Sequence, residues 1–223
     1  ELSNINTDLL RQMSETVPGT FQHSMQVANL AAEAAIRIGA KSQLVRTGAL
    51  YHDIGKMENP AFFTENQSGG VNPHKNLSYE QSAQVVISHV TDGLKLAEKH
   101  NLPKAIKDFI STHHGRGKTK FFYISWKNEH PGEEPDDEKF TYPGPNPFSK
   151  ETAILMMADA VEAILDELEI PYTEDDTWKK TGGNAGNIFA KLEGEGEPML
   201  LCAHLDSVAP ALGKKAVWKE DGT

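Results

Sequence analysis

Side chains that commonly bind metal ions are spread along roughly the first 160 residues. They are five histidines and two aspartates: His23, His52, Asp53, His89, His113, His114 and Asp159. Burying an imidazole or a carboxylate is costly unless the group is paired or binds a metal. Taken singly, each histidine is more often an ordinary hydrogen-bonded residue, but together they could supply two divalent cations that share one carboxylate. Imidazole and carboxylate without thiolate favour iron, manganese or zinc over calcium.

Two helices are expected to position the first three of these residues. Apolar residues recur at helical spacing over residues 27–38, and His23 lies on the same stripe, so its side chain is expected to point inward. A second helix is predicted from about Ser42 to His52. The pair His52-Asp53 would then lie at the end of that helix.

Two further helices are expected to position the other imidazoles. Ser78 followed by Gln81 has the pattern of a capping box, and the helix that it opens passes through His89. The next helix is predicted to start at Pro103 and to end near residues 113–114.

The last helix of this part is predicted to begin after Ser149. Thr152 stands where a full capping box has Glu or Gln, so the cap is expected to be incomplete. The expected buried face of this helix includes Val161. Asp159 lies among the same apolar residues, where its carboxylate needs a strong partner.

Residues 116–148 differ in composition from the helical stretches. Acidic residues and prolines dominate the second half, which predicts a long ordered loop or a flexible insertion. The aromatic cluster at 121–126 is more typical of a core strand than of a binding surface. The segment 142–147 is expected to form a wall beside the candidate ligands.

Composition and charge exclude several classes of protein. The chain has 223 residues and a net charge of -10, which argues against long nucleic acid as a partner. Its single cysteine, Cys202, excludes an internal disulfide and fits a reducing compartment. No apolar run approaches the roughly 20 residues of a membrane helix. Because the sequence begins at Glu1, it is expected to be part of a longer protein.

The seven residues, in this order and with their neighbours, resemble the HD-domain metal-dependent phosphohydrolases. The strings that carry the resemblance are His23-Ser24-Met25-Gln26-Val27, His52-Asp53-Ile54-Gly55-Lys56, Gly70-Val71-Asn72-Pro73-His74 and Ala158-Asp159-Ala160-Val161-Glu162-Ala163. Over about residues 1–163 they are similar to the cytoplasmic HD domain of the seven-transmembrane HD receptors. The resemblance implies a mainly α fold, an HD-domain helical bundle, within a membrane-anchored parent protein.

The activity implied by the resemblance is hydrolysis of cyclic di-AMP to linear 5′-pApA by a metal-activated hydroxide. The cofactors implied are two divalent metal ions, iron or manganese. The ligands implied for one ion are His23, His52, Asp53 and Asp159, and those for the other are His89, His113 and His114, with Asp53 bridging.

Four residues near these ligands are candidates for substrate contact or catalysis. Lys56 is expected to meet a phosphate oxygen as a point charge, and His74 to contact substrate or to protonate the leaving oxygen. Asn72 and Arg116 are the other candidate contacts. Lys56, His74 and Arg116 also have an ordinary structural interpretation. The aromatic residues at 121–126 are a weaker candidate for stacking on adenine.

Other functions stay open at this point. An HD hydrolase could act on a nucleoside triphosphate, an alarmone or cyclic di-GMP, although the Gly-Tyr-Pro string of the cyclic di-GMP branch is absent. A non-catalytic nucleotide or metal sensor is disfavoured, because a sensor has no need of two complete metal sites. Metal identity, base preference and oligomeric state are not determined by the sequence.

The segment 164–223 differs from the rest of the chain. Strands are predicted at 187–192 and 199–203, so a short α/β segment is expected to follow the helices. This segment resembles the N-terminal part of zinc aminopeptidases of the M20 type, with His204 and Asp206 in the ligand positions. One histidine cannot hold a catalytic zinc, so no peptidase activity is expected. The segment is interpreted as a truncated piece joined at a fusion seam.

Overall fold

The computed structural model describes residues 2–67, 72–167, 172–174 and 188–190, and most of them are helical. The α-helices are α1 (Asp8–Thr16), α2 (Pro18–Arg37), α3 (Ser42–Tyr51), α4 (Tyr79–Lys99), α5 (Lys104–Thr112), α6 (Lys120–Glu129) and α7 (Lys150–Glu167). Short 3-10 turns are η1 (Ile54–Glu58), η2 (Pro60–Phe62), η3 (Thr64–Asn66), η4 (Pro73–Asn76) and η5 (Asp137–Phe140). The prediction of a mainly α fold is confirmed.

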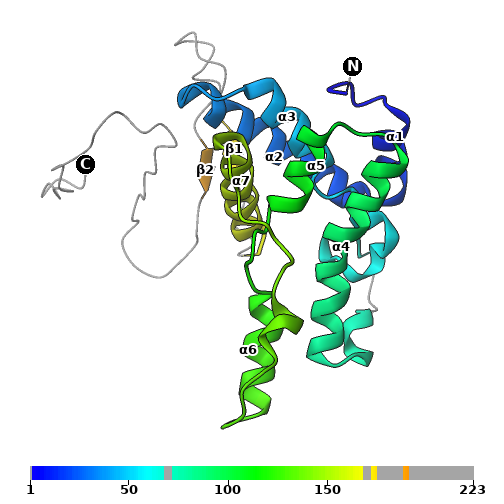
Figure 1. Ribbon diagram of the computed structural model, residues 1–223, viewed down its shortest axis with the longest axis vertical. Coiled ribbons are helices and arrows are strands. Elements are labelled where there is room, and N and C mark those ends of the chain that lie inside the picture. Colours follow the sequence, from blue (N-terminus) through cyan, green and yellow to red (C-terminus); the bar gives the residue numbers. More distant parts are fainter. Residues whose placement is uncertain (1, 68–71, 168–171, 175–187, 191–223) are drawn as a thin grey trace, which may run out of the picture.

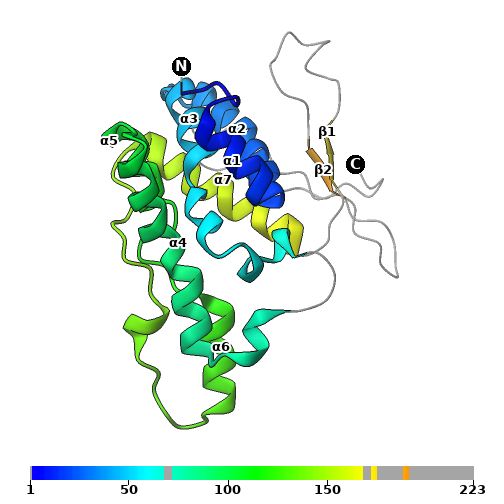
Figure 2. The ribbon, with the colours of Figure 1, turned by 90° about the vertical axis from the view of Figure 1, so that its right-hand side faces the viewer.

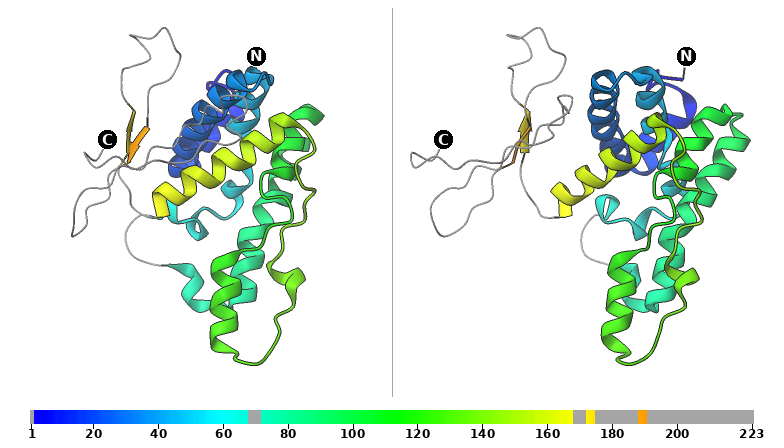
Figure 3. Two further views of the ribbon diagram at one scale, coloured as in Figure 1. Left: turned by 90° about the vertical axis from the view of Figure 1, so that its left-hand side faces the viewer. Right: turned by 60° about the vertical axis from the view of Figure 1, so that its left-hand side comes forward.

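Helix α2 lies at the centre of the larger core. It packs against α1, α3 and α7, and α3 in turn packs against α5 (Figure 1). Figure 3 shows α7 crossing beside α2. Of the predicted apolar stripe, Val27 and Ala31 are fully enclosed along α2, whereas Ile38, just after the helix, is 40% exposed, so its expected place on the buried stripe is wrong. Burial of the enclosed side chains stabilises the helix that carries His23.

Turn η1 lies against α4 at very close range. A Cβ atom built on Gly55 would lie 1.8 Å from the backbone oxygen of His89, so only glycine fits at this position. The predicted capping box at the start of α4 is confirmed, since Ser78 and Gln81 satisfy each other's backbone N–H groups. The close contact at Gly55 fixes α4 relative to the turn that follows Asp53.

Helix α6 runs beside the far half of α4, and together they extend away from the larger core (Figures 1 and 2). The interpretation of 121–126 as a core strand, inside a loop-like stretch 116–148, is wrong. Phe122, Tyr123 and Trp126 lie on one face of a helix and pack onto a second cluster with Ile87 and Phe140. This packing outweighs the strand preference of aromatic residues.

The start of α7 corrects a second expectation. The Thr152 backbone N–H donates to Ser149 Oγ at 3.1 Å, and the Ser149 N–H donates to Thr152 Oγ1 at 3.1 Å. Threonine therefore completes the reciprocal cap that was expected to be incomplete. Further along, Val161 is 40% exposed whereas Glu162 is 4% exposed, so the expected position of Val161 in the core is wrong.

Strand β1 (Tyr172–Glu174) pairs with strand β2 (Ile188–Ala190) in an antiparallel ladder that aligns Thr173 with Phe189. Strand β2 falls inside the strand predicted at 187–192. The predicted strand at 199–203, with His204 and Asp206, lies outside the described residues. Among the described helices, none is long and apolar enough to cross a membrane.

Candidate metal centre

The structure brings all seven candidate ligands into one cluster inside the helical core. They come from α2 (His23), the end of α3 (His52 and Asp53), α4 (His89), the end of α5 (His113 and His114) and α7 (Asp159). Residues separated by up to 136 positions are therefore neighbours in space. The expected convergence is confirmed, while the role of each residue as a ligand stays a prediction.

The first group of ligand atoms belongs to His23, His52 and Asp159. One ligand atom from each residue lies within 4.8 Å of those of the other two. Asp159 Oδ1 is 3.0 Å from His23 Nε2 and 3.4 Å from His52 Nε2. This group holds two imidazoles and a carboxylate, which together suit a divalent cation.

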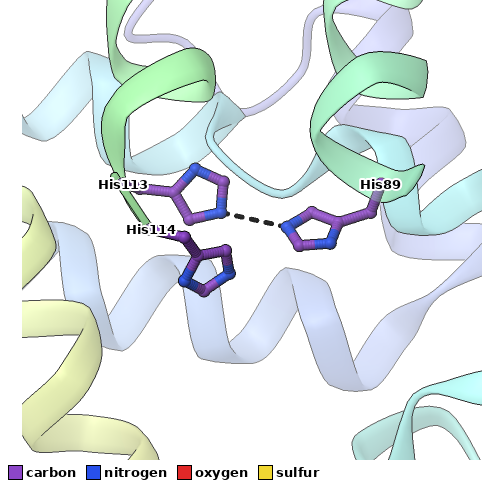
Figure 4. Close-up of side chains that lie close together, drawn as sticks. All are labelled: His89, His113 and His114. Atoms are coloured by element: carbon purple, nitrogen blue, oxygen red, sulfur yellow. Dashed lines mark hydrogen bonds between the residues drawn. The ribbon is translucent and has the colours of Figure 1, made fainter. Parts of the chain in front are cut away.

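The second group consists of His89, His113 and His114, whose ligand atoms also lie within 4.8 Å of one another. Figure 4 shows the three rings turned toward a common point, one from α4 and two from the end of α5. His89 Nε2 and His113 Nε2 are 3.0 Å apart. Three imidazoles on one point form a common set of ligands for transition metals.

Asp53 lies between the two groups and faces both. Its Oδ2 atom is 3.3 Å from His52 Nε2 and 3.8 Å from His23 Nε2. Its Oδ1 atom is 3.3 Å from His89 Nε2 and 3.5 Å from His113 Nε2. Each carboxylate oxygen thus serves a different group, which is the arrangement of a bridging carboxylate.

Two atoms of the cluster test whether these residues fit metal ions. His52 Nε2 and Asp53 Oδ1 are buried and have no hydrogen-bond partner among the described residues. Buried polar atoms are nearly always satisfied, so one such atom in each group indicates a partner still to be bound there. Nitrogen and oxygen donors that converge without hydrogen-bond geometry fit a divalent cation. The residues present therefore fit two such ions.

Backbone carbonyls orient three of the rings. Each donates from Nδ1 to the carbonyl oxygen three residues earlier: His52 to Ala49 (2.7 Å), His89 to Val86 (2.6 Å) and His113 to Ile110 (2.8 Å). Because a carbonyl can only accept, Nδ1 of each ring carries a proton, and Nε2 is the atom directed at the centre and available to a metal. His23 differs, since its Nδ1 meets the carboxylate of Glu162.

Carboxylates dominate the electrostatics of the first group. Burial opposes the charge of His23, but hydrogen bonds with Asp159 and Glu162 outweigh burial and raise its pKa to about 9. Burial is likewise outweighed at His52, where the charges and hydrogen bonds of Asp53 and Asp159 raise the pKa to about 10. Burial also opposes the charge of both aspartates, yet the facing imidazoles hold their pKa values well below the usual range.

In the second group the pKa values of His89 and His114 are lowered instead of raised. Burial lowers the pKa of His89 to about 4; the charge of Asp53 offsets part of this shift, and His113 adds to it. Burial and the neighbouring imidazoles hold the pKa of His114 well below its usual value. Neutral imidazoles are the form that binds metal, so His89 and His114 are already in their ligating state at neutral pH.

Lys56 contacts the bridging carboxylate directly. Its ammonium lies 2.8 Å from Asp53 Oδ2 and 2.8 Å from Glu65 Oε1, and Thr20 Oγ1 also donates to Glu65. Burial opposes the charge on Lys56, but the two carboxylates outweigh it and raise its pKa. Glu65 was not anticipated from the sequence, because it lies in a polar loop with no periodic pattern.

The other three candidate residues lie apart from the seven. His74 donates from Nε2 to the carbonyl of Phe62 at 2.9 Å, and Asn72 accepts from the backbone N–H of His74. Arg116 is exposed and lies 3.6 Å from Glu138. Within the described part of the chain, no hydrogen bond or ion pair joins these three to the candidate ligands.

Two residues beside the cluster complete its surroundings. Tyr142, in the segment expected to form a wall, stacks on His114 with ring centroids 4.2 Å apart and an angle of 27°. Glu162 was not singled out from the sequence. The signal that could have found it is its spacing, because a residue three positions after Asp159 lies on the same side of a helix.

Comparison with known proteins identifies the family. The model of the HD domain family matches residues 20–164, which is more than half of the chain. The chain therefore belongs to the HD domain family, and HD domains bind divalent metal ions. The resemblance found in the sequence is confirmed.

Two of the curated relatives share one name. The chain is 44% identical over 174 residues to "Cyclic-di-AMP phosphodiesterase PgpH" of Bacillus subtilis (strain 168), covering 78% of this chain and 24% of that protein. It is 45% identical over 163 residues to the protein of the same name from Listeria monocytogenes serotype 1/2a (strain 10403S), covering 73% and 22%. The chain thus spans about a quarter of the length of these relatives.

A solved structure also matches the fold. The crystal structure of the L. monocytogenes phosphodiesterase PgpH HD domain in complex with cyclic-di-AMP superposes with a TM-score of 0.69 at 43% identity. The match covers 73% of this chain and 75% of that one. The helical arrangement described above is therefore that of an HD domain.

Proposed function

We propose that this HD domain is a dimetal phosphodiesterase that hydrolyses cyclic di-AMP to linear 5′-pApA. The observation that carries the proposal is the position of Asp53, with one carboxylate oxygen toward each group of imidazoles. The names of the relatives, and the cyclic-di-AMP bound to the matching HD domain, support the choice of substrate.

The proposed ligands follow the two groups. One ion would be held by His23, His52, Asp53 and Asp159, and the other by His89, His113 and His114, with Asp53 shared. Iron or manganese is the proposed identity. When bound, such a pair of cations lowers the pKa of water and neutralises charge on the phosphoryl oxygens.

The chain's own residues hold the reacting groups in place. The backbone carbonyls that accept from Nδ1 keep the Nε2 atoms of three rings directed at the centre. Lys56 fixes the orientation of Asp53 and adds positive charge beside it, where an anionic phosphodiester would lie.

Cleavage of one phosphodiester requires a proton for the leaving oxygen. Water adds to phosphorus, the bond from phosphorus to the 3′ oxygen breaks, and that oxygen takes up a proton. We assign the proton transfer to His74, and substrate contacts to Asn72 and Arg116 as well as Lys56. The assignments of His74, Asn72 and Arg116 rest on position in the sequence, since the described hydrogen bonds and ion pairs of these three side chains lie outside the cluster. Lys56 contacts Asp53 directly.

The proposal extends to the organisation of the chain. Residues 1–163 would form the HD domain, and 164–223 a separate truncated peptidase-like segment without catalytic function. The resemblance to the receptor family supports a cytoplasmic HD domain in a membrane-anchored parent. The acidic net charge of -10 supports a small nucleotide rather than long nucleic acid as the partner.

A substrate panel tests the proposed function. The protein is stripped of metal, reloaded with Mn²⁺ or Fe²⁺ without oxygen, and incubated with cyclic di-AMP, cyclic di-GMP, an alarmone and a nucleoside triphosphate. We expect metal-dependent turnover of cyclic di-AMP to one linear product. Faster turnover of another nucleotide would favour a different HD hydrolase, and binding without turnover would favour a sensor.

A further inference from the structure

We propose that Glu162 is a positioning residue that orients His23 and selectively supports the metal site to which His23 belongs. The inference rests on the ligand set of the proposed function and adds a residue to it. Glu162 is not one of the seven candidate ligands, and it does not contact the second group among the described hydrogen bonds and ion pairs.

Two carboxylates of helix α7 contact the two ring nitrogens of His23. Asp159 Oδ1 lies 3.0 Å from Nε2, and Glu162 Oε2, three residues further along the same helix, accepts a hydrogen bond from Nδ1. Helices α2 and α7 pack against each other (Figure 3). The His23 ring therefore lies between two carboxylates of one neighbouring helix. The ring plane and the direction of Nε2 are therefore set by α7.

Burial singles out this carboxylate. Glu162 is enclosed, whereas the apolar Val161 beside it faces solvent. Its second oxygen, Oε1, has no hydrogen-bond partner among the described residues. Burying a carboxylate is costly unless it is paired, so the contact with His23 is the interaction that explains its position.

The partner of His23 also differs in kind from those of the other rings. His52, His89 and His113 each donate to a neutral carbonyl from their own helix or turn. A hydrogen bond to a carboxylate is stronger and makes the imidazole a better electron donor at Nε2. Loss of Glu162 is therefore expected to affect one site and to spare the other.

Calorimetric titration of the metal-free 223-residue protein with Mn²⁺, together with elemental analysis, tests this inference. Wild type should bind two ions. In Glu162→Ala one ion should bind as in wild type, and the other about 10- to 100-fold more weakly, as is typical when the partner of a ligating histidine is removed. Glu162→Gln should lie between them, because its amide oxygen still accepts from Nδ1 without the charge.

The matched control is Glu151→Gln, the same change on the same helix at a position near solvent. It should bind both ions as wild type does. Two ions bound with unchanged affinity in Glu162→Ala would overturn the positioning role alone. Equal weakening of both ions in a folded Glu162→Gln protein would also overturn it. A wild type that does not bind two ions would overturn the proposed function itself.

Discussion

The ammonium nitrogen of Lys56 lies 2.8 Å from Oδ2 of Asp53, three residues earlier in the same turn. That oxygen also faces His52 and His23, while Oδ1 is left to face the second group. The ion pair with Lys56 thus holds the carboxylate in the orientation in which each oxygen faces a different group of imidazoles.

Removal of the shared carboxylate should disable both metal sites. In Asp53→Ala each group loses one oxygen ligand, so we expect loss of most bound metal and a fall in cyclic di-AMP turnover of about 1,000-fold or more. Elemental analysis and product chromatography measure the two effects. Turnover near the wild-type level would contradict the bridging assignment.

Removal of the lysine should destabilise the folded protein. In Lys56→Met the carboxylates of Asp53 and Glu65 lose their shared partner, and breaking a buried ion pair in this way costs about 3–5 kcal/mol. Urea unfolding of the metal-free protein measures the loss. Lys95→Met breaks an exposed pair with Asp92 and serves as the control, for which no measurable change is expected.

The metal-free protein should be most stable near pH 6.5. The folded-state pKa values of His23 and His52, about 9 and 10, lie above the unfolded value of about 6.5. Their contribution to the stability of the fold is therefore complete below about pH 6.5 and is lost as the pH rises from there through the folded-state values. His89 has a folded-state pKa of about 4, which lies below the unfolded value. Its effect on stability is therefore opposite in direction: the folded state loses stability as the pH falls from 6.5 toward 4. The lowered pKa values of Asp53 and Asp159 act in the same direction at acid pH.

Denaturant unfolding in the presence of a chelator, repeated between pH 4 and pH 10, measures this profile. Saturation with metal should abolish the alkaline decline, because the ligating imidazoles then hold a cation in place of a proton. A metal-free protein whose stability rises between pH 7 and pH 9 would contradict the prediction.

Substitution of Gly55 should disturb both metal sites at once. A methyl group there meets the backbone of His89, so Gly55→Ala must move η1 away from α4, with a loss of stability of about 1–3 kcal/mol. Metal content should fall for both ions. Gly39→Ala is the control: its φ of 67° strains an alanine, but nothing lies within 4 Å, so metal content should stay at two ions.

The C-terminal segment should be dispensable for metal binding. Helix α7 continues to Glu167, beyond the boundary predicted at 163, so the shortened chain should end after that residue. We expect it, and the full-length His204→Ala variant, to bind metal and to turn over cyclic di-AMP as the full chain does. A large loss of turnover in either protein would show that residues after Glu167 contribute to the site.

The convergence of the candidate ligands could be predicted because several of them stand beside a local sequence signal. His52-Asp53 ends a periodic helix, and His89 follows a capping box. Two features that the sequence did not predict, helix α6 and the contact of Glu162 with His23, depend on tertiary packing. Helix α6 forms because Trp126 and its neighbours meet α4, and local propensity is a poor guide there. The spacing of Glu162 from Asp159 places it on the inner side of the helix, but its partner His23 lies 139 positions earlier, so no window of neighbouring residues shows the contact that it makes.

The contact between Gly55 and the carbonyl of His89 has a consequence for how this domain can diversify. Main chain touches main chain there, so the separation of the two halves of the centre is set by the backbone and not by adjustable side chains. Changes in substrate preference are therefore expected in segments beside the centre, such as 142–147, where Tyr142 stacks on His114. The candidate metal centre is therefore rigid, and new specificities are expected to arise from changes in the segments that surround it.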